Sequence, residues 1–157
     1  MTATGTGTVT AAAALLAGTV ALAPGAAAVT PTQATTQYHC GNLLGWVNAQ
    51  LTATQTGSYA TMTVQLTSVD APIAIQGYSI ASTLMLDDVN TGQPVVFMGT
   101  VNPPLSVGDP IVLGPLSGVV DPGESLDVYG KELTFVMLGI RFDCQAVTPL
   151  SPGPFAF

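Results

Sequence analysis

Apolar and polar residues alternate along much of the chain after about residue 36. Residues 58–69 are the clearest case, because between residues 60 and 67 every even position is apolar and every odd position is Thr or Gln. Successive side chains of a strand point to opposite faces, so this pattern predicts a strand with one buried face. Residues 46–53 alternate in the same way, and Thr54 to Gly57 form a turn between the two segments. We predict an antiparallel hairpin here.

Residues 133–144 are the most apolar run outside the N-terminal region, and we predict that they form one long final strand. Its even positions end at Cys144, and its odd positions include Leu133, Phe135 and Met137. A strand in a two-layer sheet protein normally buries one face, yet the first half of this segment is apolar on both. We predict that these three side chains form an interaction face. The C-terminal residues Phe155 and Phe157 are the alternative cover for that face.

Turn residues recur about every eight to twelve residues between these short segments, and no convincing helical pattern follows residue 29. This spacing is typical of an all-β sandwich or barrel. We predict an immunoglobulin-like β-sandwich of about seven or eight strands, in which the first and last strands lie side by side.

The first 28 residues have the composition of an export signal: an Ala-rich apolar stretch, a Pro-Gly pair and three alanines. No Lys or Arg precedes the apolar stretch, so either the true start lies upstream of Met1 or the signal is an unusual one. A disordered Ala/Thr/Gly tail is the alternative. We predict a signal peptide at 1–28, a linker at 29–35, the sandwich at 36–145 and a Pro-rich tail at 146–157. The protein is then secreted and extracellular.

The two cysteines, Cys40 and Cys144, lie near the ends of the predicted domain. Two cysteines normally pair in an oxidising compartment. A shared metal is the competing interpretation, but zinc sites use closely spaced ligand pairs, and the only histidine is His39. We predict a disulfide that joins the first and last strands.

Three short motifs resemble a known group of proteins. Tyr38-x-Cys40 follows the leader, Pro122-Gly123 forms a turn, and Phe142-x-Cys144 closes the last strand. This arrangement is similar to secreted immunoglobulin-like domains of unknown function in actinobacteria, and it covers roughly residues 38–144. The resemblance implies the sandwich fold and an extracellular location, and it implies no catalytic residues. The neocarzinostatin-type carriers are a second comparison, but they have two disulfides, which counts against it.

Composition excludes several classes of partner and of chemistry. Two Lys or Arg residues stand against nine Asp or Glu residues, for a net charge of -7. Nucleic acids and anionic lipid head groups bind clustered Lys and Arg, so we predict neither as a partner. No apolar run after the leader reaches the roughly 18 residues of a spanning helix, so we predict no membrane span in the mature protein. His39 has no nucleophile signature beside it, and we predict no enzymatic activity and no cofactor.

Two further features have alternative interpretations. Asp87, Asp88 and Asn90 offer oxygen ligands for Ca²⁺, but a hairpin turn uses the same residue types, and we predict the turn. Trp46 shares its parity with Asn48 and Gln50, where it would be an exposed platform for a sugar ring. We favour a core position for Trp46, because a lone aromatic seldom forms a sugar site and a one-residue slip would turn it inward.

Two functions fit this sequence. The first is a structural or interaction module at the cell surface or in the medium, which binds a protein partner or a second copy of itself through Leu133, Phe135 and Met137. The alternative is a small-molecule carrier that binds an apolar ligand between or beside the sheets.

Overall fold

The computed structural model describes residues 28–157, so the predicted signal peptide lies outside the described residues except for Ala28. Ten strands and one short helix make up this part of the chain. They are β1 (Gln33–His39), α1 (Gly41–Leu44), β2 (Trp46–Thr56), β3 (Tyr59–Asp70), β4 (Ala81–Asp88), β5 (Pro94–Thr100), β6 (Pro110–Val119), β7 (Ser125–Asp127), β8 (Glu132–Met137), β9 (Ile140–Ala146) and β10 (Phe155–Ala156). The all-β prediction is confirmed.

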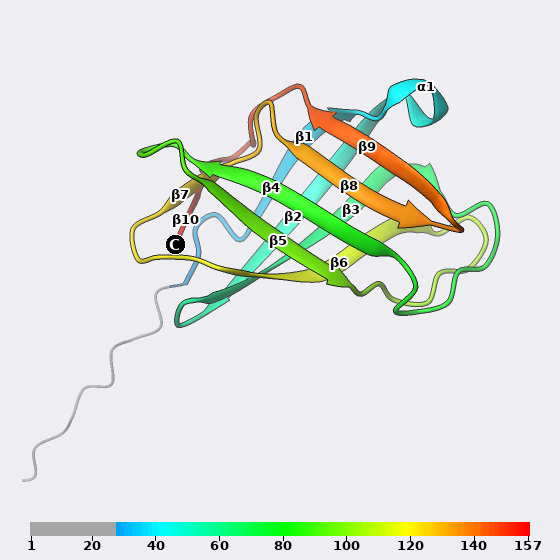
Figure 1. Ribbon diagram of the computed structural model, residues 1–157, viewed down its shortest axis with the longest axis horizontal. Coiled ribbons are helices and arrows are strands. Elements are labelled where there is room, and N and C mark those ends of the chain that lie inside the picture. The colour runs from blue at the N-terminus through cyan, green and yellow to red at the C-terminus, as the bar shows by residue number, and fades with distance from the viewer. Residues whose placement is uncertain (1–27) are drawn as a thin grey trace, which may run out of the picture.

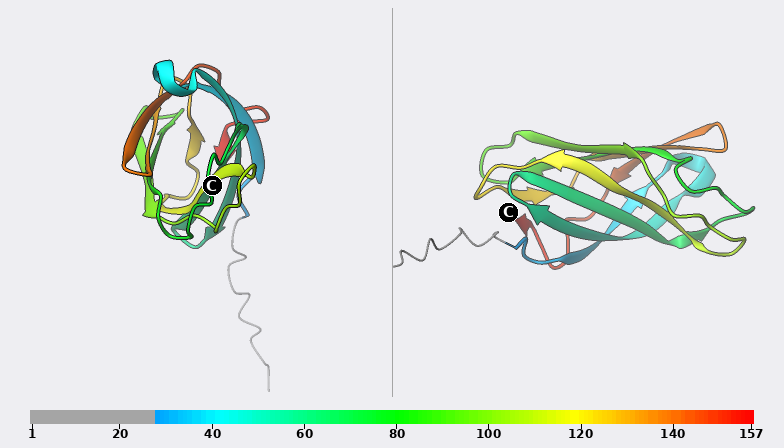
Figure 2. Two further views of the ribbon diagram at one scale, coloured as in Figure 1. Left: turned by 90° about the vertical axis from the view of Figure 1, so that its right-hand side faces the viewer. Right: turned by 90° about the horizontal axis from the view of Figure 1, so that it is seen from below.

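The strands form a closed antiparallel barrel, and the prediction of a sandwich is wrong. The order β4-β5-β6-β3-β2-β1-β9-β8 is completed by a direct pairing between β8 and β4. The eight ribbons surround a common axis in Figure 1, and the ring is seen end-on in the left view of Figure 2. The short strands β7 and β10 lie outside the ring, with β7 paired to the end of β4. A sandwich and a barrel have the same alternation of apolar residues and the same turn spacing in their sequences. The pairing of β4 with β8 is what makes this fold a barrel.

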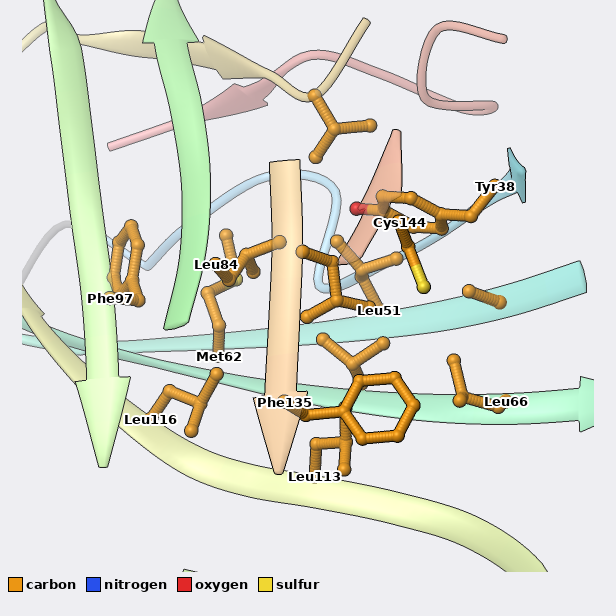
Figure 3. Packing of buried hydrophobic residues seen from close by; sticks show 14 of the residues in the cluster. Tyr38, Leu51, Met62, Leu66, Leu84, Phe97, Leu113, Leu116, Phe135 and Cys144 are labelled. Carbon is orange, nitrogen blue, oxygen red and sulfur yellow. The ribbon is translucent and has the colours of Figure 1, made fainter. Parts of the chain in front are cut away.

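The predicted hairpin at residues 46–69 is confirmed as β2 and β3. Its register places the two apolar parities opposite each other, for example Leu51 against Val64. The eight apolar residues of the alternating runs 47–53 and 60–66 are all buried, while the intervening Thr, Asn and Gln side chains face outward. The inward side chains of the other strands complete one packed interior, part of which is drawn in Figure 3.

The long final strand predicted at residues 133–144 is instead a hairpin. β8 and β9 pair antiparallel, from Glu132 with Gln145 to Met137 with Ile140, and Leu138 and Gly139 form a two-residue turn. Because the chain reverses, the inward parity changes from odd positions in β8 to even positions in β9. The apolar character of the turn conceals it in the sequence.

The predicted linker at 29–35 and the predicted C-terminal tail at 146–157 both contribute to the fold. Val29 is buried, and the Thr30 amide donates to the carbonyl of Ala156 at 3.0 Å. In the C-terminal segment, Phe155 and Phe157 are also buried. The folded region therefore begins before residue 36 and continues past residue 145.

The Cys40–Cys144 disulfide is confirmed, and it joins residues 104 positions apart in the chain. Cys40 directly follows β1, and Cys144 lies within β9, so the bond closes the seam between these neighbours. Only two residue pairs of regular ladder join β1 to β9.

Candidate functional site

One end of the barrel holds an apolar cavity of about 370 Å³. This end carries α1, the β3–β4 and β5–β6 loops and the β8–β9 turn, which lie together on the right of Figure 1. Nine residues line the cavity, and Asp70 is the only ionisable one. The lining residues are Leu43, Leu44, Val69, Asp70, Pro72, Met137, Leu138, Ile140 and Phe142. We call this space the end cavity.

The floor of the end cavity is the last layer of the barrel core. Met137 and Phe142 are buried there, and the Phe142 ring stacks on Phe135 with centroids 4.8 Å apart. The side chain of Val69 packs against the core from β3, where the register with β6 is irregular between Leu66 and Asp70.

The rim of the end cavity consists of apolar side chains exposed to solvent. Leu43 is 75% exposed, Leu138 53% and Ile140 51%. Ile140 pairs with the buried Met137 and so lies on the inward face of β9, one layer beyond the point where the core ends. The interior of the barrel therefore continues at this end as an open apolar pocket.

Leu138 occupies a conformation that disfavours leucine. Its φ is 55°, and the following Gly139 has a φ of 78°. Two positive φ values define the type I′ hairpin turn, in which Asn-Gly is the favoured pair. Leucine in this left-handed region costs about 1–2 kcal/mol. The chain thus holds a large apolar side chain at the rim of the cavity at some expense in stability.

Tyr78, in the β3–β4 loop at the same end, is the other described residue besides glycine with a positive φ, at 58°. It is exposed, and its amide donates to the carbonyl of Asn102. The buried Asn102 side chain accepts hydrogen bonds from the amides of Ser79 and Ile80, at 2.8 and 2.9 Å. It also donates to the carbonyl of Gln76. This network holds the loop in its strained form.

The disulfide positions one wall of the end cavity. Cys40 directly precedes α1, and its amide donates to the carbonyl of Gly45 at 2.8 Å, which closes residues 40–45 into a compact loop. Gly41 and Gly45 both have a φ of 65°, a value that glycine adopts without strain. The bond to Cys144 fastens this loop, with Leu43 and Leu44, to the strand that carries Ile140 and Phe142.

The structure places Leu133, Phe135 and Met137 inside the barrel rather than on its surface. Their exposed fractions are 0%, 1% and 6%. These side chains therefore offer no face to a partner in the folded barrel, except where Met137 forms part of the cavity floor. They face inward because the β8–β9 hairpin makes the odd positions of β8 and the even positions of β9 the inward ones. The sequence signal for the candidate site was Gly139, since a glycine within an apolar strand pattern indicates a bend or turn.

The predicted hairpin turn is present between β4 and β5, where Asp87 and Asp88 end β4 and Asn90 lies in the turn. The carboxylate of Asp88 accepts hydrogen bonds from the Asn90 and Ser125 amides and, at 2.7 Å, from the Thr91 hydroxyl. These bonds lower the pKa of Asp88, with that from Ser125 contributing most. Asp87 forms an ion pair with Lys131 at 2.6 Å. In residues 28–157, no group of three His, Cys, Asp or Glu side chains is arranged to hold a metal.

Trp46 lies on the surface, so the favoured core position was wrong. It is 63% exposed, and its ring forms a T-shaped pair with the neighbouring His39 ring at a centroid distance of 5.0 Å. Its parity with Asn48 and Gln50 on the outer face of β2 was the correct indication.

Comparison with known proteins adds no relative: no family model, curated protein or solved structure matches the chain. Within the described range, no helix combines the length and the apolar character needed to cross a bilayer. The fold and the cavity define the class of the protein: a disulfide-closed, eight-stranded barrel with an apolar pocket at one end.

Proposed function

We propose that this protein is a secreted, non-enzymatic binding protein that holds a small apolar molecule in the end cavity. The end cavity itself carries this proposal. Its volume of about 370 Å³ falls in the range of about 300–1,000 Å³ typical of small-molecule pockets, and eight of its nine lining residues are apolar. The disulfide supports an extracellular location, since such bonds persist in oxidising compartments.

Strain at the rim supports a binding role. Asn at position 138 would satisfy the turn better than Leu, yet the chain keeps Leu there. Residues held in sparsely populated backbone conformations cluster at active sites and ligand-binding sites. Tyr78 has the same combination of strain and exposure at the same end of the barrel.

The charge at the cavity restricts the ligand. Asp70 is the ionisable residue of the lining, and the protein carries a net charge of -7. A fatty acid carboxylate placed here would meet like charges. The ligand is therefore a neutral apolar molecule, or one whose polar end is cationic.

A fluorescence titration with Nile red, a neutral apolar dye, tests the proposal. Covering the exposed half of Leu138 or of Ile140 contributes about 1 kcal/mol each, since full burial of such a side chain is worth about 1.5–3 kcal/mol. A Leu138→Asn/Ile140→Thr variant should therefore bind the dye about 30-fold more weakly. Leu138→Asn alone should bind about fivefold more weakly while raising the free energy of unfolding by about 0.5–1 kcal/mol.

Val89→Asn is the matched control, because it removes a half-exposed apolar side chain from the turn at the opposite end of the barrel. It should leave dye affinity unchanged. Equal affinity of the native protein and the double variant, or no saturable binding by the native protein, would contradict the proposal. Because Asn favours the turn, loss of binding in Leu138→Asn would not reflect unfolding.

A further inference from the structure

A second concave surface lies on the side of the barrel, away from the end cavity. It is an open groove of about 760 Å³ across the outer faces of β1 and β2, bounded by the C-terminal segment 148–151. Thr35, Gln37, Asn48 and Gln50 form its base, with Thr67 of β3 beside them. We call it the side groove.

The wall of the side groove is held firmly against β1. The amides of Thr35 and Ser151 each donate to the other's carbonyl at 2.9 Å. The backbone amide of Gln37 donates to the Thr148 hydroxyl at 2.9 Å, and the backbone amide of Val147 donates to the backbone carbonyl of Gln37 at 2.8 Å. The concavity is thus a built feature of the fold and is present before any ligand arrives.

No lining residue of the side groove is charged. All Asp, Glu, Lys and Arg residues of the chain fall between Asp70 and Asp143, whereas the groove is made from segments before and after this range. The groove therefore has no ion-pair partner for a charged ligand, and the net charge of -7 opposes anions. Its chemistry is that of neutral hydroxyl and amide groups.

Two amide pairs lie across the β1–β2 ladder at the base of the groove. Gln37 Nε2 donates to Asn48 Oδ1 at 3.3 Å, and Gln50 Nε2 donates to Gln33 Oε1 at 3.3 Å. In each pair, one side-chain amide uses its NH₂ group and the other uses its carbonyl oxygen in the mutual hydrogen bond. The remaining donor and acceptor groups, such as Nδ2 of Asn48 and Oε1 of Gln37, are available to a ligand. Neighbouring donors and acceptors of this kind match vicinal hydroxyls, which both donate and accept.

An aromatic platform extends this row. His39 and Trp46 are the next outward-facing pair of the same ladder after Gln37 and Asn48, two residues along, or about 7 Å. The exposed Trp46 ring packs against the His39 ring in a T-shaped arrangement, which limits its rotation. A pyranose ring has an apolar C–H face that packs on an aromatic ring and hydroxyls around its edge, so it matches a ring next to amides.

We propose that the side groove and Trp46 together bind a neutral polysaccharide. The occupant is a chain of uncharged sugars, with one ring stacked on Trp46 and the next residues hydrogen-bonded to Asn48 and Gln37. This site is separate from the end cavity, so the proposal does not depend on the proposed function. It gives the protein a means of attachment to an uncharged glycan surface.

Affinity electrophoresis of the disulfide-bonded mature chain in gels that contain soluble dextran, laminarin or mannan tests this proposal. At least one of these neutral glycans should retard the protein. Trp46→Ala should weaken the interaction at least tenfold and Asn48→Ala about threefold. Met98→Ala, which truncates a similarly exposed side chain on β5, should have no effect. Salt should change the affinity little, because no charges take part.

The proposal would be overturned by no retardation with any of the three glycans, by retardation that is unchanged in Trp46→Ala, or by preferential binding to anionic alginate. The other possible occupant of the side groove is a second copy of this chain. Sedimentation of the native protein and of Trp46→Ala tests this possibility by measuring the oligomeric state of each. A native dimer that dissociates in the variant would assign the face to self-association and refute glycan binding. Leu138→Asn should leave retardation unchanged, which separates this test from that of the end cavity.

Discussion

Removal of the Cys40–Cys144 disulfide should reduce stability far more than it changes the native fold. The bond joins residues 104 positions apart, and it therefore closes most of the folded domain into one loop. On the chain-entropy model, a loop of this length restricts the unfolded state by about 4.7 kcal/mol. Residual structure in the unfolded chain reduces this effect, and measured losses are about 2–5 kcal/mol.

The native barrel has other contacts at the same seam. Six residue pairs join β9 to β8, and four more join β8 to β4, so β9 stays in place from its other side. Two residue pairs and the hydrogen bonds from segment 147–151 still hold β1. The loop of α1 loses its covalent link to β9. We therefore expect the reduced barrel to remain folded, with a less ordered wall at the end cavity and weaker Nile red binding.

Urea unfolding of the native protein and of a Cys40→Ser/Cys144→Ser variant measures this effect. The variant should lose about 2–5 kcal/mol, out of a total of about 5–15 kcal/mol for a domain of this kind, and its m-value should rise because its unfolded chain is more expanded. Adding a thiol reductant should lower the free energy of unfolding of the native protein and leave that of the variant unchanged. A loss below about 0.5 kcal/mol, or two reactive thiols in the unfolded, unreduced protein, would refute this reasoning.

Two other predictions concern buried polar groups. The Tyr38 hydroxyl is buried without a hydrogen-bond partner among residues 28–157, and burial raises its pKa above the ordinary 10.0. Tyr38→Phe should therefore raise the free energy of unfolding by about 1 kcal/mol in urea, and a loss of that size would reveal an unrecognised partner. The Asp88 pKa lies below its ordinary 3.8, so its carboxylate stabilises the fold above that pH and loses this effect as the pH falls through the lowered value. The stability difference between the native protein and Asp88→Asn should narrow on acid titration below about pH 4, and a constant difference would contradict the assignment.

The strands and the site were not equally predictable from sequence. The faces of β2 and β3 were predicted correctly, because alternation reports burial directly. The β8–β9 turn was missed, since Leu138 replaces the Asn that usually signals a type I′ turn. That one omission turned Leu133, Phe135 and Met137 into an apparent surface and concealed Leu138 and Ile140, which line the end cavity.

By itself, the sequence determined an all-β domain, the buried parity of its clearest strands and the pairing of its two cysteines. These properties follow from local rules: side-chain direction alternates along a strand, and two lone cysteines in one chain have only each other to pair with. Tertiary structure alone decided that the sheet closes, because closure depends on β8 meeting β4, a contact between segments about fifty residues apart. It also decided which apolar residues are core and which are rim. Ile140 and Phe142 lie on the same face of β9, and they differ only in that the barrel ends between them.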